Sequence, residues 1–158
     1  MAWGKLASET LTTTADNLSS GTITANKFIQ VMANRIPSGS TRFKLSFNND
    51  SGNNYSQRAS QDGGSDGTDT GIPFLESVGD QTIPTFHILN IVNISSEEKL
   101  VIQFYVIQNT AGAGTAPGRV EHTGKWTNTS SQITEIDFDN TSGGDFASDT
   151  NISVLGTD

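Results

Sequence analysis

Residues 86–107 of this chain, FHILNIVNISSEEKLVIQFYVI, contain the strongest β-strand signal in the sequence. Two runs, Phe86–Ile94 and Leu100–Ile107, are rich in β-branched and aromatic residues, which favour strands. The polar residues Ser95–Glu98 separate them and are typical of a turn. The pattern therefore predicts a long antiparallel hairpin. Because both faces of each run are apolar, we expect two central strands that are covered on both sides.

Other segments alternate apolar and polar residues with period two, the pattern of strands that have one face on a core. Arg42–Asn48 is the clearest example. Further strands are expected at Lys27–Ile36, along a face formed by Val120, His122, Gly124 and Trp126, at Ile133–Phe138 and Asn151–Leu155, and more weakly at Leu6–Leu11 and Leu18–Ile23. No convincing helical period occurs. We predict an all-β chain, an antiparallel β-sandwich that is jelly-roll-like, with roughly eight to ten strands in one domain over residues 1–158.

This strand assignment also predicts the hydrophobic core and the loops. We expect eight apolar side chains to be largely buried: Phe43, Leu45, Phe47, Ile88, Ile102, Phe104, Ile136 and Phe138. Residues 49–73 are expected to form a long irregular excursion, with Asp62–Gly71 exposed and mobile. Residues 111–118 lack the Lys-Ser/Thr ending of a phosphate-binding loop, and we predict a hairpin connection there.

Composition and charge exclude several classes of function. The net charge of −8 disfavours nucleic acid as a partner, because phosphate binding needs a basic surface. The longest apolar run is far shorter than the roughly 20 residues that span a membrane. The chain has no cysteine, and its N-terminal residues do not resemble a secretory signal.

The charges are distributed unevenly along the chain. Residues 1–58 contain six Lys/Arg and three Asp/Glu, whereas the remainder contains three and fourteen. One hypothesis is that a basic patch, including Arg35, Arg42 and Lys44, contacts an acidic patch of a neighbouring copy. The alternative is that both sets of charges are scattered over a solvated surface.

The residues offer little for catalysis, and we expect no enzyme, no cofactor and no resident metal. A serine triad needs a histidine base, but His87 and His122 both lie in strand patterns and are expected to be packed with satisfied rings. Glu121 and Glu135 could be imagined as a glycosidase pair, yet their separation cannot be obtained from sequence. Asp62, Asp66 and Asp69 have oxygens for calcium but not the spacing of an EF-hand, and a flexible acidic loop is the preferred interpretation.

Several stretches of the sequence show a similarity that amino-acid composition alone does not explain. They are Ala2–Leu6, Leu45–Tyr55, Gly118–Glu121, Gly124–Trp126, Ile133–Phe138 and Ser142–Gly156. Together they resemble a diverse family of small virion structural proteins from tailed phages, although Asp149 stands where Gly is common. The resemblance implies a jelly-roll-like domain on the capsid surface or the tail. It implies no catalytic residue.

The leading hypothesis is therefore a structural protein located in the virion, a capsid decoration or vertex protein. It would assemble in multiple copies as a homo-oligomer with other virion proteins as partners. The alternative is a receptor- or glycan-binding jelly-roll module of a tail fibre, because Tyr55, Trp126 and Trp3 could supply an aromatic platform for a surface glycan. An enzyme is the weakest of the three hypotheses.

Overall fold

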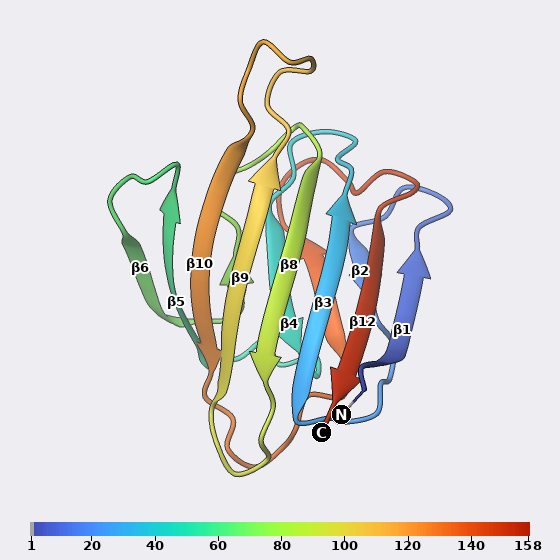
Figure 1. Cartoon of the computed structure of the whole chain (residues 1–158), viewed down its shortest axis with the longest axis vertical. Helices are drawn as coiled ribbons and strands as arrows, with labels where there is room; N and C mark the ends of the chain where they lie inside the picture. The colour runs from blue at the N-terminus through green and yellow to red at the C-terminus, as the bar shows by residue number, and fades with distance from the viewer. Residues whose placement is uncertain (1) are drawn as a thin grey trace.

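The computed structural model describes residues 2–158 and contains strands in two antiparallel sheets (Figure 1). The predicted all-β sandwich is confirmed, with twelve strands where roughly eight to ten were expected. Within the described residues, no helix is long and apolar enough to cross a membrane. The two termini lie at the same end of the molecule (Figure 1).

The large sheet has eight strands in the order β1-β12-β3-β8-β9-β10-β5-β6. Their bounds are β1 Gly4–Thr10, β12 Asn151–Thr157, β3 Phe28–Arg35, β8 Thr85–Val92, β9 Lys99–Ile107, β10 Gly118–Trp126, β5 Tyr55–Gln61 and β6 Gly67–Ile72.

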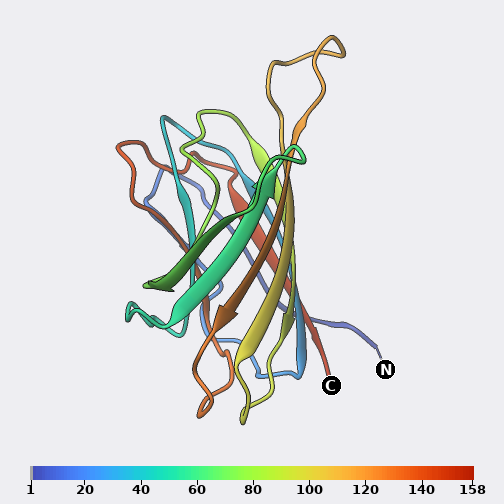
Figure 2. The same ribbon diagram turned by 90° about the vertical axis from the view of Figure 1, so that its left-hand side faces the viewer.

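The small sheet has four strands in the order β2-β11-β4-β7 and covers one face of the large sheet (Figure 2). Its strands are β2 Asn17–Ser19, β11 Ile136–Asn140, β4 Phe43–Phe47 and β7 Leu75–Glu76. The opposite face of the large sheet is not covered by any strand of the described chain.

Two hairpins widen the large sheet. They are β5–β6 and β9–β10, which pair with each other through β5 and β10. When these four strands are set aside and the other eight are renumbered in chain order, the sheets have the orders 1-8-3-6 and 2-7-4-5.

The hairpin predicted in residues 86–107 is confirmed as β8 and β9, with Val92 opposite Leu100 and Thr85 opposite Ile107. The hairpin connection predicted at residues 111–118 is also confirmed, and this loop between β9 and β10 projects beyond the sheets (Figures 1 and 2).

The prediction of a long irregular segment over residues 49–73 is wrong. Tyr55–Gln61 forms β5 against β10, and Gly67–Ile72 forms β6 against β5. The segment Asp62–Gly71, which was expected to be an exposed and mobile loop, thus contains most of the edge strand β6. Its side chains are exposed, so an apolar alternation never develops, and backbone pairing alone defines the strand.

The core lies between the sheets and is built from alternate strand residues. In β3 the odd-numbered residues from Ile29 to Arg35 point inward, and in β4 Phe43, Leu45 and Phe47 do so. The prediction is confirmed for five of the eight expected core residues, which are buried: Phe43, Leu45, Phe47, Ile136 and Phe138. A sixth, Ile88, is only partly buried.

For the other two expected core residues, Ile102 and Phe104, the prediction of burial is wrong. Ile102 is 63% exposed and Phe104 is 43% exposed. Both belong to β9, and the expectation that β8 and β9 are covered on both faces is also wrong. The buried face of β9 is the one that carries Val101, Gln103 and Tyr105.

Gly124 has a packing role on the inner face of β10. A Cβ atom at this position would lie 2.7 Å from both Cδ atoms of Leu75. The predicted face of Val120, His122, Gly124 and Trp126 does point inward, and the missing side chain at Gly124 makes room for β7.

Candidate functional site

The outer face of the large sheet is the main unusual surface of this protein. On the three central strands β3, β8 and β9, twelve side chains point outward. Nine are apolar, three are amides and none carries a charge: Phe28, Gln30, Met32, Asn34, Phe86, Ile88, Asn90, Val92, Leu100, Ile102, Phe104 and Val106. We call these twelve residues the outer face.

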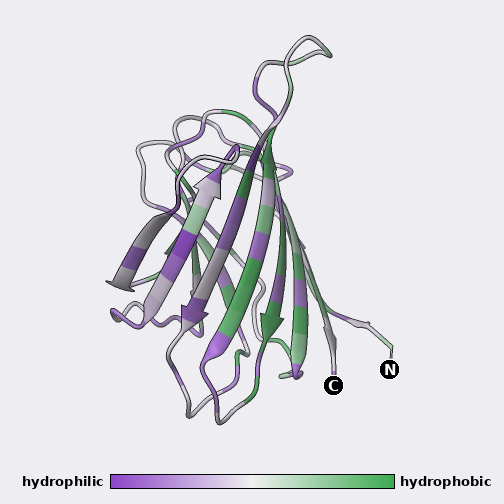
Figure 3. Cartoon of the chain, turned by 60° about the vertical axis from the view of Figure 1, so that its left-hand side comes forward, coloured by the Kyte–Doolittle hydropathy of each residue, from purple (hydrophilic) through white to green (hydrophobic). Residues whose placement is uncertain are grey.

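Large apolar side chains of the outer face are well exposed. Leu100 is 54% exposed, and Phe28, Phe86, Ile102 and Phe104 are also among the exposed large hydrophobic residues. Hydrophobic residues concentrate on β8 and β9 in Figure 3, whereas β10 and β5 carry more hydrophilic ones. Contiguous exposed apolar patches on soluble domains usually mark sites of interaction.

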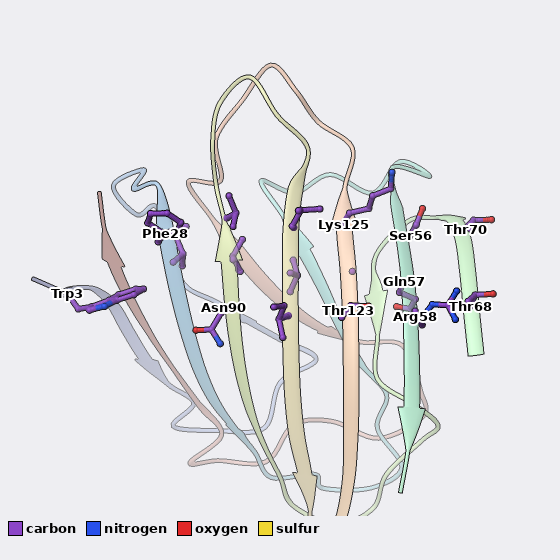
Figure 4. A pocket seen from close by; sticks show the side chains of 17 residues that line it. Trp3, Phe28, Ser56, Gln57, Arg58, Thr68, Thr70, Asn90, Thr123 and Lys125 are labelled. Carbon is purple, nitrogen blue, oxygen red and sulfur yellow. The ribbon is translucent and has the colours of Figure 1, made fainter. Parts of the chain in front are cut away.

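A hollow of about 710 Å³ lies across one half of this surface (Figure 4). Trp3 stands at one side of it, next to Phe28, and Arg58 stands at the other side with Thr68. The floor includes Leu100, Ile102, Asn90 and Thr123. The hollow thus has an apolar floor, an aromatic side and a polar side.

The rim beyond β9 is polar. On β10 the outward residues are Arg119, Glu121, Thr123 and Lys125, and Arg119 lies 3.8 Å from Glu121 in an ion pair. Lys125 pairs with Glu98 at 2.8 Å. An apolar centre with a polar rim is the usual arrangement of a protein interface.

The two histidines point to the other side of the sheet, into the interior. His87 and His122 are each no more than 2% exposed, and each ring nitrogen has a polar contact. The prediction that both rings are packed and satisfied is confirmed. Burial lowers the pKa of His122 to about 4 and that of His87 well below its usual value.

The two candidate carboxylates are not brought together. Glu121 lies on β10 in the large sheet and pairs with Arg119. Glu135 precedes β11 of the small sheet, where it accepts hydrogen bonds from Ser19 at 3.1 Å and Asn49 at 2.7 Å.

The three aspartates considered for calcium have separate partners. Asp66 pairs with Arg58 at 2.9 Å, Asp69 accepts a hydrogen bond from Gln57, and Asp62 accepts one from the backbone of Arg119. Over residues 2–158, no three His, Asp or Glu side chains are grouped so that they could hold a metal ion.

Of the three aromatic residues considered for sugar binding, only Trp3 is exposed, at 50%. Trp126 is buried, and its indole N–H donates to Asp50 at 2.6 Å. Tyr55 is also buried, and burial raises its pKa. A sugar platform built on Tyr55 and Trp126 is therefore ruled out, and Trp3 remains.

The proposed basic patch loses one member. Arg35 is buried, donates to the carbonyls of Thr41 and Ile83, and its pKa is lowered by burial to about 10. Arg42 already pairs within the chain, with Asp80 at 2.8 Å and Glu76 at 3.3 Å. The Lys44 ammonium lies 3.5 Å from the centre of the Phe74 ring.

The sequence signal for the outer face was present but was assigned to the core. Strands that are apolar on both faces predict burial on both faces. Only the tertiary structure shows that the strands form two sheets, so that the small sheet covers one face of the large sheet and no strand of the described residues covers the other. No protein-family model, no curated protein and no solved structure matches this chain.

Proposed function

We propose that this chain is a non-enzymatic structural protein of a tailed-phage virion, a capsid decoration or vertex protein present in multiple copies. The observation that carries the proposal is the outer face, which a lone subunit would leave in contact with water. A surface of this kind is stabilised when another protein covers it, because removing apolar area from water is favourable by roughly 25 cal/mol per Å².

The strand order supports the jelly-roll part of the proposal. In a jelly roll, a long ribbon of paired strands is rolled into a sandwich, so that strand 1 pairs with 8, 2 with 7, 3 with 6 and 4 with 5. The corresponding pairs here are β1 with β12, β2 with β11, β3 with β8, and β4 with β7. The two additional hairpins extend only the sheet that carries the outer face.

The β9–β10 hairpin also enlarges the apolar surface, whose other apolar residues lie on β3 and β8. Leu100, Ile102 and Phe104 all belong to β9, which is one of the four strands outside the eight-strand arrangement. A strand placed there for stability alone would need only one apolar face. Its second apolar face favours contact with a partner.

The test is reconstitution on particles that lack the protein. Purified wild-type protein is added to such particles, and its occupancy is measured by gel densitometry. We expect saturable binding for the wild type and about tenfold weaker binding for Ile102→Asp. Thr115→Asp, in the exposed loop between β9 and β10, is the matched control and should bind like the wild type.

Two results would contradict this proposal. One is a wild-type protein that binds no particle component. The other is equal occupancy for Ile102→Asp and the wild type, which would show that the outer face takes no part in assembly.

A second candidate function is glycan binding as part of a tail fibre. The specific observation in its favour is the hollow of Figure 4, where the exposed Trp3 stands opposite Arg58 and Thr68 with Asn90 between them. Aromatic rings and side chains that both donate and accept hydrogen bonds are the groups that hold a sugar ring. A glycan array probed with the wild type and Trp3→Ala tests this: wild-type binding that Trp3→Ala abolishes supports it, and an empty array contradicts it.

A further inference from the structure

We propose that the partner of the outer face is a second copy of this chain, packed face to face across a two-fold axis that runs along β8. The inference rests on the proposed function, since it names the partner of the surface that carries that function. The dimer would be a unit of assembly, formed before or during attachment to a particle.

The area of the sheet is sufficient for a stable dimer. With the axis along β8, the seven strands from β1 to β5 in the sheet order overlap. Strands lie about 4.8 Å apart and rise about 3.4 Å per residue, so seven strands of about eight residues give a face of about 900 Å² in projection. A standard protein interface buries about 800 Å² on each partner. Two copies packed in this way would meet that requirement without any other contact.

The chemistry of the outer face is self-complementary, as a two-fold interface requires. Apolar side chains can face their own copies without penalty, whereas a row of like charges would repel itself. The three polar members, Gln30, Asn34 and Asn90, are amides that both donate and accept hydrogen bonds. Gln30 and Asn90 already bond to each other at 3.1 Å, which shows this pairing within one copy.

The outer face itself places the axis, because β8 is the middle one of the three strands that carry it. β12 and β10 lie at equal distance on the two sides of β8, and so do β3 and β9. A two-fold axis along β8 therefore places β9 of one copy over β3 of the other. Because Phe28, Val92 and Leu100 share one level of the sheet, Phe28 would contact Leu100 of the second copy.

The next apolar level gives the same result. Met32, Ile88 and Phe104 are in register across β3, β8 and β9, so Met32 would face Phe104 of the other copy and Ile88 would face itself. Large and flexible apolar side chains thus meet at both levels.

The charges on the rim agree with this axis. The outward residues of β10 include Arg119, Glu121 and Lys125, and β10 would lie over β12 of the second copy. The residues of β12 that point outward are Asn151, Ser153 and Leu155, and each is partly exposed. The charged strand would meet an uncharged one instead of its own copy.

Site-specific cross-linking tests the geometry directly. Because the chain has no cysteine, Asn90→Cys introduces a single thiol on the proposed axis. Packed sheets are about 10 Å apart, so a bismaleimide of about that span should join two copies. Thr70→Cys is the matched control: it is exposed on β6, at the far edge of the same sheet, and its two copies would be too far apart.

We expect sedimentation velocity to show a dimer for the wild type and efficient cross-linking for Asn90→Cys only. Ile102→Asp should raise the dimer dissociation constant at least about tenfold and remove the cross-link from the double variant with Asn90→Cys. Since Ile102 is exposed, the thermal melting curve of the monomer should not change, which shows that the variant is folded.

The inference is overturned if the wild type stays monomeric at all accessible concentrations, or if Thr70→Cys cross-links as well as Asn90→Cys. A monomer that nevertheless binds particles through Ile102 would mean that another virion protein covers the outer face, so the proposed function would stand and the dimer would not. A dimer that binds no particle would mean that the dimer inference stands and the proposed function does not.

Discussion

His87 and His122 lie on strands that are separated by β9, and their Nδ1 atoms contact opposite ends of one amide. The Nδ1 atom of His87 is 2.8 Å from Gln103 Nε2, and the Nδ1 atom of His122 is 2.7 Å from Gln103 Oε1. The outer nitrogens also have partners: His87 Nε2 is 2.7 Å from Thr85 Oγ1, and His122 Nε2 is 3.2 Å from Gln57 Oε1. A polar chain therefore crosses four neighbouring strands inside the protein.

The Gln57 end of this hydrogen-bond network determines which ring nitrogens carry the protons. Gln57 Oε1 accepts from the backbone N–H of Glu76 at 2.7 Å, and Gln57 Nε2 donates to Asp69 at 3.0 Å. Gln57 Oε1 is thus an acceptor, and the Nε2 of His122 must carry the proton that faces it. Nδ1 of a neutral His122 must then accept, which requires the amide nitrogen of Gln103 on that side.

We therefore predict that His122 is the Nε2–H tautomer and His87 the Nδ1–H tautomer. A half-turn of the Gln103 amide, which exchanges two groups of nearly equal size, then satisfies every member of the chain. Long-range ¹H–¹⁵N NMR spectra distinguish the two tautomers of each ring. An Nδ1–H signal from neutral His122 would contradict the arrangement.

The second prediction concerns Gln103 itself. Gln103→Leu removes the group that both imidazoles contact and leaves a buried polar atom on each ring without a partner. Each such atom costs about 1–3 kcal/mol, so the two together should lower the free energy of unfolding by about 2–6 kcal/mol. Urea denaturation measures it. Gln108→Leu, at an exposed glutamine directly after β9, is the control, with a change within about 0.5 kcal/mol. Equal effects would mean that the buried hydrogen-bond network adds nothing to stability.

The third prediction is loss of stability in acid. The pKa of His122 is about 4 in the folded protein because burial disfavours the charged ring, whereas an unfolded histidine titrates near ~6.5. Between these values the unfolded chain binds a proton that the folded chain does not, so the stability contribution is complete above pH ~6.5 and is lost as the pH falls toward 4. The loss from His122 is about 3 kcal/mol.

The measurement is urea denaturation over this pH range. Burial lowers the pKa of His87 as well, so both rings act in the same direction. His122→Gln should make the curve of stability against pH less steep. An unchanged slope in that variant would show that other groups cause the acid sensitivity.

The fourth prediction compares two phenylalanines. Phe47 is fully buried between Tyr55 and Trp126, and Phe104 lies on the outer face. Phe47→Ala should cost about 3–5 kcal/mol because it leaves a cavity in the core. Phe104→Ala should change the free energy of unfolding of the monomer by less than about 1 kcal/mol, measured by chemical denaturation at low protein concentration. A reversed order would mean that the faces of β9 are misassigned.

The fifth prediction concerns Asp50, whose carboxylate accepts the indole N–H of the buried Trp126. Asp50→Ala leaves that N–H without an acceptor, and we expect a loss of about 1–3 kcal/mol. Asp66→Ala is the control, because it removes only an exposed ion pair with Arg58, which typically contributes under about 1 kcal/mol. Thermal melts followed by tryptophan fluorescence measure both. Similar losses in the two variants would show that the hydrogen bond to Trp126 is not special.

The sequence of β4 and of the β8–β9 hairpin was sufficient to predict strands and their approximate ends. Alternation in Phe43–Phe47 and the β-branched run of residues 86–107 are local properties, and strand pairing requires little more than a polar turn between them. The common face of His122 and Trp126 on β10 followed from the same period of two.

Other features depended on residues that are distant in the chain. β5 and β6 have mostly polar side chains, so no alternation marks them, and they are strands because β10 offers a row of backbone donors and acceptors to Tyr55–Gln61. Arg35 occupies an inward position of β3, although its charge predicted a place at the surface.

The sequence by itself determined that this is an all-β protein, since each strand's alternation is a local pattern of side chains and a strand needs no other information to form its two faces. Only the tertiary structure decided which of the two apolar faces of β9 is buried. Val101 and Ile102 are both β-branched aliphatic residues, and Tyr105 and Phe104 are both aromatic. What separates the two pairs is that the small sheet and its connections cover one side of β9 and leave the other open. Burial is a property of the surroundings, and those are set by contacts between segments far apart in the chain.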